Sequence, residues 1–484
     1  MKTRFSVCLF ASMISMATLG CGNEGQGGPV TSAQLDITTV PTGVQCVKVV
    51  VTIGTQTVNP PLMTVAAGAS SASLSLGQLP VGSATFQANA YNVACSAVTS
   101  TTVANWVADP ASATLSYGNV ASVAMNFRSN SPVTVKANFS ASVAEVYTSI
   151  WASYARMSDG TVTQWGGTGV SNNFTPLAVP SLTNVATIAA GNTFACAVKT
   201  DGTVWCWGYN WSGGNLGPNV AVGGWATTPV QIPGLLGYGL VTDIAAGPFH
   251  VCAVTAGGYL FCWGDNSNGQ FGSGTTGTYN PTPVFSRSST GSVAAGYNYT
   301  CILDSWSNVM CAGLNDVGQL GNGTQVNSST FVYSWSIGAI AVATGYSHTC
   351  LIALDNTVRC FGQNNSGNLG DGTFNSRLSP VTVVGLSNVV QIKAGSGNTC
   401  ALLQGGTLSC WGENQFLGTG QLANQPLPVQ VPSLSGVVGL SMNQGSHACV
   451  LLSDDSVKCW GENSDGEIGN GTCDYAPKPT TVLF

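Results

Sequence analysis

The chain has 484 residues, only 7% of them charged, and a formal net charge of −6 at pH 7. Its 44% hydrophobic residues and 61 glycines are typical of a well-buried, turn-rich protein and exclude a disordered one. The acidic balance and the lack of a basic cluster argue against a nucleic-acid partner, because little would neutralise the phosphates. The length suits one small domain and one large one.

The first residues predict an export signal. Lys2 and Arg4 precede an apolar stretch from Phe5 to Leu19, which is too short to span a bilayer. Gly20 and Cys21 follow it. We therefore expect residues 1–20 to be a signal peptide.

Gly20-Cys21 resembles the end of a bacterial lipoprotein signal, in which the cysteine becomes the lipidated first residue. The resemblance implies lipid attachment at Cys21. Gly22, in place of aspartate, implies the outer membrane and so a lipid-anchored location in the bacterial cell envelope. Thr18 stands where the family usually has leucine, which leaves cleavage by an ordinary signal peptidase as the alternative.

Residues 21–32 are rich in glycine and polar residues and suit a flexible tether. Residues 33–139 then alternate at strand period, as in Cys46 to Val51, and turn sequences such as Asn59-Pro60-Pro61 separate the runs. We expect a small Greek-key β-sandwich with a Cys46–Cys95 disulfide. Its expected role is that of a spacer, and a second binding module is the alternative.

Residues 142–484 contain seven repeat units of about 50 residues. Each unit shows an alternating apolar run ending in glycine, two runs joined by a tight turn, a long polar loop and a fourth short run. Four short strands per unit, without helical periodicity, predict the blades of a β-propeller.

In six of the seven units two cysteines stand ten residues apart. The pairs are Cys196/Cys206, Cys252/Cys262, Cys301/Cys311, Cys350/Cys360, Cys400/Cys410 and Cys449/Cys459. A three-residue hairpin turn between the second and third runs places both cysteines opposite each other, at a separation that a disulfide spans. The first unit has Tyr154 and Gln164 there, so both cysteines are absent together. We expect disulfides; reduced pairs or metal ligands are the alternatives.

Three of the 17 cysteines remain outside these seven pairs. Cys8 leaves with the signal peptide and Cys21 is the expected lipid attachment site. Cys473, in the loop of the last unit, has no assigned partner, and a free thiol and an intermolecular link both stay open.

The loop after the third run carries a family motif. It reads Trp263-Gly264-Asp265-Asn266-Ser267-Asn268-Gly269-Gln270-Phe271-Gly272, with variants in later units, and Gly345-Tyr346-Ser347-His348-Thr349-Cys350 shows the approach to a first cysteine. The combination resembles the regulator of chromosome condensation (RCC1) repeat family over residues 142–484. The resemblance implies a seven-bladed propeller. The family's nucleotide-exchange role on a nuclear GTPase is not expected to transfer to an exported, disulfide-bonded chain.

The three histidines give no sign of catalysis. His250, His348 and His447 all lie two residues before a first blade cysteine, where other units have phenylalanine, tyrosine or asparagine, so we expect a packing role. Asp265, Glu413 and Glu462 share one loop position, but three carboxylates in seven units do not predict a metal site. We therefore expect no enzyme activity, no cofactor and no metal.

Surface features that depart from the repeat predict where a partner binds. Trp306 lies at a hairpin tip, and Trp335 lies where the fourth unit hands over to the fifth. The handover after the second unit carries an insertion with Leu235, Leu236 and Tyr238. All of these fall on one face of a four-strand meander, which predicts a binding surface there. The rival is the enlarged loop of the second unit, with Trp211 and Trp225, on the opposite face.

The leading hypothesis is a non-enzymatic cell-surface lipoprotein whose propeller binds an unknown protein at the cell envelope, with membrane contact through the lipid alone. Glycan or cell-wall binding, through stacking on the exposed tryptophans, is one alternative. Inhibition of a secreted enzyme is another, since secreted bacterial proteins similar to these propellers can inhibit β-lactamases.

Overall fold

The structure is a computed structural model and describes residues 142–484 except 168–171, 212 and 422. Before residue 142 it describes residues 30–37, 44–53, 56–59, 62–66, 72–80, 82–92, 94–98, 104, 106–107, 111–115, 121–127 and 131–139. The expected signal peptide, Cys21 and most of the expected tether lie outside these residues. No helix among the described residues is long and apolar enough to cross a membrane.

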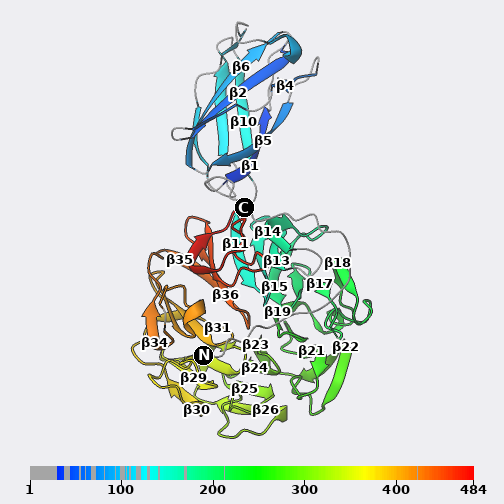
Figure 1. The fold of residues 1–484 in the computed structure, drawn as a ribbon. Helices are drawn as coiled ribbons and strands as arrows, with labels where there is room; N and C mark the ends of the chain where they lie inside the picture. Colours follow the sequence, from blue (N-terminus) through cyan, green and yellow to red (C-terminus); the bar gives the residue numbers. More distant parts are fainter. Residues whose placement is uncertain are drawn as a thin grey trace, which may run out of the picture.

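Residues 30–139 form two antiparallel sheets, drawn apart from the ring in Figure 1. One has the order β5-β1-β10-β9, and the other has β3-β2-β6-β7, with β4 paired to β2 and β8 to β6. The elements are β1 (Val30–Ile37), β2 (Cys46–Ile53), β3 (Gln56–Val58), β4 (Met63–Thr64), β5 (Ala72–Pro80), β6 (Gly82–Tyr91), the 3-10 turn η1 (Cys95–Ala97), β7 (Trp106–Val107), β8 (Ala111–Leu115), β9 (Ala121–Phe127) and β10 (Ser131–Phe139). The Cys46–Cys95 disulfide is formed, and it ties β2 to the turn after its neighbour β6.

Seven four-stranded antiparallel sheets follow and form a ring (Figure 1), so the predicted seven-bladed propeller is confirmed. Blade 1 is β11 (Val143–Thr148), β12 (Ala152–Met157), β13 (Val162–Gly167) and β14 (Asn172–Ala178); blade 2 is β15 (Val185–Ala190), β16 (Phe194–Lys199), β17 (Val204–Tyr209) and β18 (Trp225–Gln231); blade 3 is β19 (Val241–Ala246), β20 (His250–Thr255), β21 (Leu260–Asn266) and β22 (Gly277–Arg287). Blade 4 is β23 (Thr290–Ala295), β24 (Tyr299–Asp304), β25 (Val309–Gly313) and β26 (Ser328–Trp335); blade 5 is β27 (Ala339–Thr344), β28 (His348–Ala353), β29 (Val358–Gly362) and β30 (Arg377–Thr382). Blade 6 is β31 (Val389–Ala394), β32 (Asn398–Leu403), β33 (Leu408–Gly412) and β34 (Gln425–Gln430); blade 7 is β35 (Val437–Met442), β36 (His447–Leu452), β37 (Val457–Gly461) and β38 (Ala476–Thr481).

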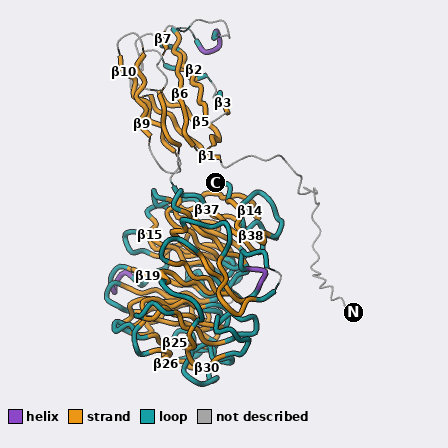
Figure 2. The backbone as a smooth tube through the Cα atoms, turned by 90° about the vertical axis from the view of Figure 1, so that its left-hand side faces the viewer, coloured by secondary structure: helices purple, strands orange, loops and turns teal. Residues whose placement is uncertain are grey.

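Within each blade the first strand lies at the centre of the ring and the fourth at the rim (Figure 1), and we call the four strands a to d. Figure 2 shows that strands and loops make up nearly all of the described chain. The exceptions are η1 and two further 3-10 turns, η2 (Leu236–Tyr238) and η3 (Asn414–Phe416).

The b–c hairpins have the register that the cysteine spacing predicts. Each of the six cysteine pairs is directly opposed in the ladder and joined by a disulfide, with Cα atoms 4.0 to 4.1 Å apart. The paired cysteines are therefore bonded to each other, and they are neither reduced thiols nor metal ligands in this structure. The disulfides are Cys196–Cys206, Cys252–Cys262, Cys301–Cys311, Cys350–Cys360, Cys400–Cys410 and Cys449–Cys459.

The turn, and not the bond alone, specifies each hairpin. Tyr154 and Gln164 are opposed in blade 1 in the same way as the cysteines elsewhere. The turn residue has a positive φ in all seven blades, including Ser307 (φ 65°) and Asp455 (φ 65°), where glycine is absent. The bond therefore closes a hairpin that the turn already specifies.

An irregularity that the cysteine spacing did not predict follows the strand c cysteine. In each of the six disulfide blades the pairing of strands c and d shifts register between that cysteine and the glycine two residues later. The glycine has a positive φ in every case. The pairs are Cys206/Gly208, Cys262/Gly264, Cys311/Gly313, Cys360/Gly362, Cys410/Gly412 and Cys459/Gly461. Strand c therefore pairs without interruption with b and only irregularly with d.

One asparagine organises the long c–d loop in blades 4, 5 and 7. In blade 4, Asn315 accepts a hydrogen bond from the Leu320 amide at 2.9 Å and donates to the carbonyls of Thr324 and Val326 at 3.0 and 3.1 Å. Blades 5 and 7 repeat the arrangement around Asn364 and Asn463. The asparagine side chain thus bonds backbone groups of the loop that have no neighbouring strand to pair with. It also positions Leu320 and its equivalents in the core.

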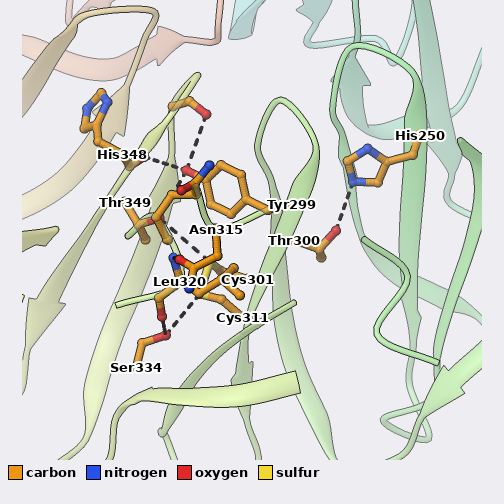
Figure 3. The surroundings of a disulfide bond; sticks show 12 residues. His250, Tyr299, Thr300, Cys301, Cys311, Asn315, Leu320, Ser334, His348 and Thr349 are labelled. Carbon is orange, nitrogen blue, oxygen red and sulfur yellow. Dashed lines mark hydrogen bonds between the residues drawn. A yellow bond between two sulfur atoms is a disulfide. The ribbon is translucent and has the colours of Figure 1, made fainter. Parts of the chain in front are cut away.

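Buried polar side chains join neighbouring blades at the start of strand b. In four blades the first residue of strand b bonds a hydroxyl at the second residue of strand b in the next blade. The pairs are His250–Thr300 (2.9 Å), Tyr299–Thr349 (3.1 Å), His348–Thr399 (2.9 Å) and His447–Ser153 (2.8 Å). Figure 3 shows the first two beside the Cys301–Cys311 disulfide. The expected structural role of the histidines is confirmed. Burial lowers their pKa, to about 3 for His250 and about 4 for His348 and His447.

The second residue of strand b carries a hydroxyl only where the first residue of strand b in the preceding blade can bond it. Phe194 of blade 2 faces Val251, and Asn398 of blade 6, which donates to the Phe416 carbonyl instead, precedes Ala448. The two residues therefore vary together across the described blades, as expected for a buried polar group that must be paired. This covariation is visible in the sequence.

Tryptophans of strand c make the second contact between blades. Their indole nitrogens donate to loop carbonyls of the preceding blade, in the pairs Trp165–Glu467 (2.8 Å), Trp263–Asn215 (3.0 Å), Trp411–Asn368 (2.9 Å) and Trp460–Phe416 (3.0 Å). Trp207 donates to the side chain of Gln164 at 2.8 Å. All five are at most 4% exposed, so these tryptophans belong to the core. The first of these pairs, with His447–Ser153, closes the ring between blades 7 and 1.

Blade 7 carries a glutamate at a position where blades 2 to 5 have asparagine or glutamine. Gln270 and Gln319 accept a backbone amide through Oε1 and donate through Nε2 to an aspartate. Glu467 accepts the Asp465 amide at 3.0 Å through Oε2, while its buried Oε1 has no hydrogen-bond partner. Burial first, then the nearby carboxylates of Asp465 and Glu462, raises its pKa to about 7.

We predict that Glu467→Gln stabilises the protein at pH 8 and has little effect at pH 5. The folded pKa lies above the unfolded one, so wild type binds the extra proton in the folded state. That contribution is complete below about pH 4.5 and is lost as pH rises through about 7. The gain at pH 8 is on the order of 2–3 kcal/mol, measured by denaturant unfolding of both proteins at each pH. An equal difference at both pH values would contradict the buried, protonated carboxyl.

We predict that non-reducing peptide mapping recovers Cys252 and Cys262 in one linked peptide. Replacing both by alanine removes a bridge across a short loop and lowers the free energy of unfolding by about 2–3 kcal/mol. Free thiols at both positions in the native protein would show that the hairpin bond is absent.

Candidate functional site

The ring has two faces that differ in their connections. The a–b and c–d loops emerge on one face, called the loop face, and the b–c tips and the blade-to-blade segments emerge on the other, called the handover face. Backbone bonds join these segments in series. Ala256 donates to Leu240, Thr290 to Gly258, Ser305 to Ser289, and Ala339 to Ser307. The hairpin tips of blades 3 and 4 and the handover segments from blade 2 to blade 5 are thus joined through their backbones.

Trp306 is the most exposed tryptophan in this surface. It lies at the b–c tip of blade 4, and its side chain is 70% exposed. The tip is held by Asp304, whose Oδ1 accepts the amides of Trp306 and Asn308 at 2.9 Å each. A large apolar ring is thus presented to solvent on a fixed backbone, as sequence analysis expected.

Trp335 is held by its own blade and its neighbour. It is half-buried, and its indole donates to the Gly338 carbonyl at 3.1 Å. The guanidinium of Arg359 lies 4.8 Å from its ring centroid. Because these contacts hold it and it is only partly exposed, Trp335 offers less surface to a partner than Trp306 does.

The insertion after blade 2 splits into one buried leucine and an exposed turn. Leu235 is only 2% exposed and packs in the core between blades 2 and 3, so its assignment as a contact residue is wrong. Leu236 and Tyr238, in η2, are each 50% exposed. The ring of Tyr238 packs against Tyr259 and Phe261. Leu235 anchors the segment so that the two residues on η2 face solvent.

The structure adds apolar residues that sequence analysis missed. Ile337 and Leu354 lie in the handover into blade 5 and at its b–c tip, and Ile340, Val390 and Val438 are the second residues of β27, β31 and β35. A register shift after the first residue of each a strand turns the second residue outward. The signal in the sequence was a bulky residue where blades 2 to 4 have alanine, threonine and glycine. We call Leu236, Tyr238, Trp306, Ile337, Ile340 and Leu354 the handover patch.

The rival loop of blade 2 is one end of a row of aromatic rings on the loop face. Trp225 and Trp211 both contact Tyr209, with centroids 4.6 and 4.9 Å apart. Trp211 contacts Phe249 at 5.7 Å and also donates to Thr193. The row continues through Tyr297 and ends at Tyr346. We call these six rings the aromatic arc.

The propeller cysteines belong to the core and to neither of these surfaces. Every one of the twelve side chains is 0% exposed, so none can contact a partner or a ligand. The disulfides are structural members of the blades. Those on strand b are Cys196, Cys252, Cys301, Cys350, Cys400 and Cys449, and those on strand c are Cys206, Cys262, Cys311, Cys360, Cys410 and Cys459.

The centre of the ring is narrow and lined largely by alanines of the a strands. Lys393 and Asp243 also line it. The Asp243 carboxylate accepts the amides of Val293 and Ile244 at 2.9 Å each, and burial lowers the pKa of Lys393. Among the described residues no group of three or more histidine, cysteine or acidic side chains could hold a metal ion. Cys473 is half-buried and takes no part in the seven disulfides.

Comparison with known proteins identifies the repeat. Residues 185–213, 241–270, 339–368, 389–416 and 438–467 match one sequence model of the regulator of chromosome condensation (RCC1) repeat, and residues 257–303 and 355–402 match a second. An Arabidopsis thaliana mitochondrial protein, RCC1 domain-containing protein RUG3, is 37% identical over 108 residues, 22% of each chain. The human E3 ubiquitin-protein ligase HERC2 is 34% identical over 131 residues, which are 24% of this chain and 3% of the ligase.

Solved structures share the fold. Human WBSCR16 superposes with a TM-score of 0.59 at 22% identity and covers 64% of this chain and 85% of its own. Yeast RCC1 (Prp20), solved bound to Kap60, gives 0.57 at 21% identity, with 64% and 78% covered. A second structure of the Saccharomyces cerevisiae protein is described together with its binding to Gsp1p and histones.

We predict opposite results for two adjacent leucines. Leu235→Ala opens a cavity in the core and lowers the free energy of unfolding by about 2–5 kcal/mol. Leu236→Ala, on the exposed turn, changes it by less than about 0.5 kcal/mol. Denaturant unfolding of both variants checks the assignment, and comparable losses in the two would contradict it.

Proposed function

Because the propeller of this chain belongs to the RCC1 repeat family, we propose that the protein is a non-enzymatic scaffold that binds a partner protein on its handover face. The observation that carries this proposal is the handover patch. Exposed large apolar side chains gathered on one face are a usual mark of a protein-binding surface. Aromatic anchors such as Trp306 are the residues that most often dominate such contacts.

The relatives support protein binding as the mode of action. Yeast RCC1 has been solved bound to another protein, and its binding to Gsp1p and histones is described. Those partners belong to that protein, and the low sequence identity carries the fold alone. What we carry over, as part of the proposal, is only that a protein with this fold binds other proteins.

The polar residues that could act in catalysis are already used in contacts within the ring, which supports binding rather than catalysis. All three histidines are buried, and each bonds a hydroxyl in the next blade. Burial lowers their pKa well below the range useful for proton transfer near neutral pH. Asp265 is likewise occupied by Ser267 and Gln270.

We place the protein at a bacterial cell envelope, attached to the outer membrane by lipid on Cys21. Seven disulfides support an oxidising compartment outside the cytosol. The signal sequence that carries the lipid assignment lies among residues 1–29, outside the described structure. The two sheets of residues 30–139 act as a spacer between membrane and ring. If the partner bound at the handover patch is a secreted enzyme, the protein acts as an inhibitor of that enzyme.

Site-specific crosslinking tests the proposed face. A photo-crosslinking amino acid at position 306 of the full chain, expressed in cells that carry the protein naturally, is expected to give one discrete adduct with another envelope protein. The matched control places the same group at Val326, which is also 70% exposed but lies in the c–d loop of blade 4 on the loop face.

An adduct from position 306 that is absent from position 326, and that Leu236→Ala/Ile337→Ala weakens, supports the proposal. Equal adducts from both positions, or an adduct from 326 alone, would move the partner off the handover face. No adduct from either position would leave protein binding without support and overturn the proposed function.

A further inference from the structure

A polar pocket of about 290 Å³ lies on the loop face where blades 5 and 6 meet. The a–b loop of blade 5 contributes Tyr346, and the c–d loop contributes Gln363, Asn365 and Ser366. Blade 6 contributes Ser396 and Glu413. Loops of two neighbouring blades thus bring these groups together in one pocket.

Five polar side chains of this pocket are not used by the fold, whereas a sixth, that of Asn368, donates to the Gln363 carbonyl. Within the part of the chain that the structure describes, Gln363, Asn365, Ser366, Ser396 and Glu413 make no side-chain hydrogen bond. Equivalent residues elsewhere are occupied: Asp265, at the repeat position of Gln363 and Glu413, bonds both Ser267 and Gln270. Two amides, two hydroxyls and one carboxylate are therefore available to a ligand.

Glycine at position 397 keeps the pocket open. A Cβ atom there would lie 2.8 Å from Oε2 of Glu413 and 3.7 Å from Oγ of Ser366. An alanine there would force the Glu413 carboxylate, the end of a flexible side chain, away from its present place in the pocket lining.

An aromatic ring forms one wall. Tyr346 is 38% exposed and stacks on Tyr297, with centroids 4.0 Å apart and planes inclined by 28°. Tyr297 continues into the aromatic arc through Phe249 at 5.9 Å. The pocket therefore lies at the end of a track of rings that runs back to blade 2.

The chemistry of the lining selects a class of ligand. No lysine or arginine lines the pocket, and Glu413 adds negative charge, so phosphate, sulfate and carboxylate groups are disfavoured. A wholly apolar ligand would leave five polar side chains unpaired, which costs free energy. A pyranose offers both an apolar C–H face for the tyrosine ring and hydroxyls for the amides and the carboxylate.

We propose that the pocket binds a neutral pyranose unit of a glycan, with Tyr346 against its C–H face and Gln363, Asn365 and Glu413 on its hydroxyls. The aromatic arc receives neighbouring units of the same chain. This site is separate from the handover patch, so the failure of either proposal leaves the other unaffected.

The test applies the labelled full chain to an array of neutral, N-acetylated, sialylated and sulfated glycans, followed by calorimetric titration of the best ligand. We expect neutral glycans to be retained and anionic ones to be excluded. Tyr346→Ala and Gly397→Ala are each expected to weaken binding by about tenfold or more. Asn365→Ala changes an exposed side chain outside the core and is expected to weaken binding without affecting folding.

Tyr238→Ala is the matched control, because it removes a half-exposed tyrosine on the handover face and should leave glycan affinity unchanged. Crosslinking from position 306 should persist in Tyr346→Ala, so failure of one site is distinguishable from failure of the other. The proposal is overturned if no neutral glycan binds, if only anionic glycans bind, or if Tyr346→Ala, Gly397→Ala and Asn365→Ala all retain wild-type affinity.

Discussion

Contacts that pass from one blade to the next hold this ring together, and they combine shared apolar cores with buried hydrogen bonds. The disulfides cannot do so, because each of the six in the propeller closes a hairpin within one sheet. The polar contacts between sheets come from buried pairs such as His348–Thr399 and from indoles that donate to loop carbonyls of the preceding blade. In a buried interface an unmade bond costs more than a made one gains, so the two partners must be present or absent together. Blades 2 and 6 satisfy this with Phe194 beside Val251 and with Asn398 near Ala448.

That framework leaves the two faces free to differ. Exposed residues at strand ends and loop tips lie outside the shared core, so most of them can change without disturbing the contacts between blades. The handover face gathers apolar side chains around Trp306, whereas the loop face combines the aromatic arc with a pocket of unpaired amides and hydroxyls. The first chemistry suits a protein surface and the second suits a hydroxyl-rich ligand. One ring can therefore present two kinds of contact at once.

Sequence reasoning succeeded where a residue's environment follows from neighbours close in the chain. The hairpin register, the left-handed turn residues and the buried tryptophans all follow from spacing within a single repeat. It failed for Leu235, because the depth of an inserted turn depends on the neighbouring blade that receives it. It missed Ile340 and Val390, because a bulge reverses the side on which the second residue of an a strand emerges. For Trp335 sequence reasoning was right in part, since it anticipated the position of the residue but not the Arg359 contact that holds it.

The sequence by itself determined the blades, their disulfides and their number, because the hairpins and disulfides rest on contacts within about ten residues of chain and each repeat supplies one blade. Only the tertiary structure decided which side chains meet across an interface and which stay unpaired. Tyr346 and Glu413 lie 67 positions apart in the sequence and share a pocket only because blades 5 and 6 pack side by side. Exposure and unused hydrogen-bonding capacity are properties of the assembled ring, since they depend on every group that surrounds a side chain, including groups distant in the sequence.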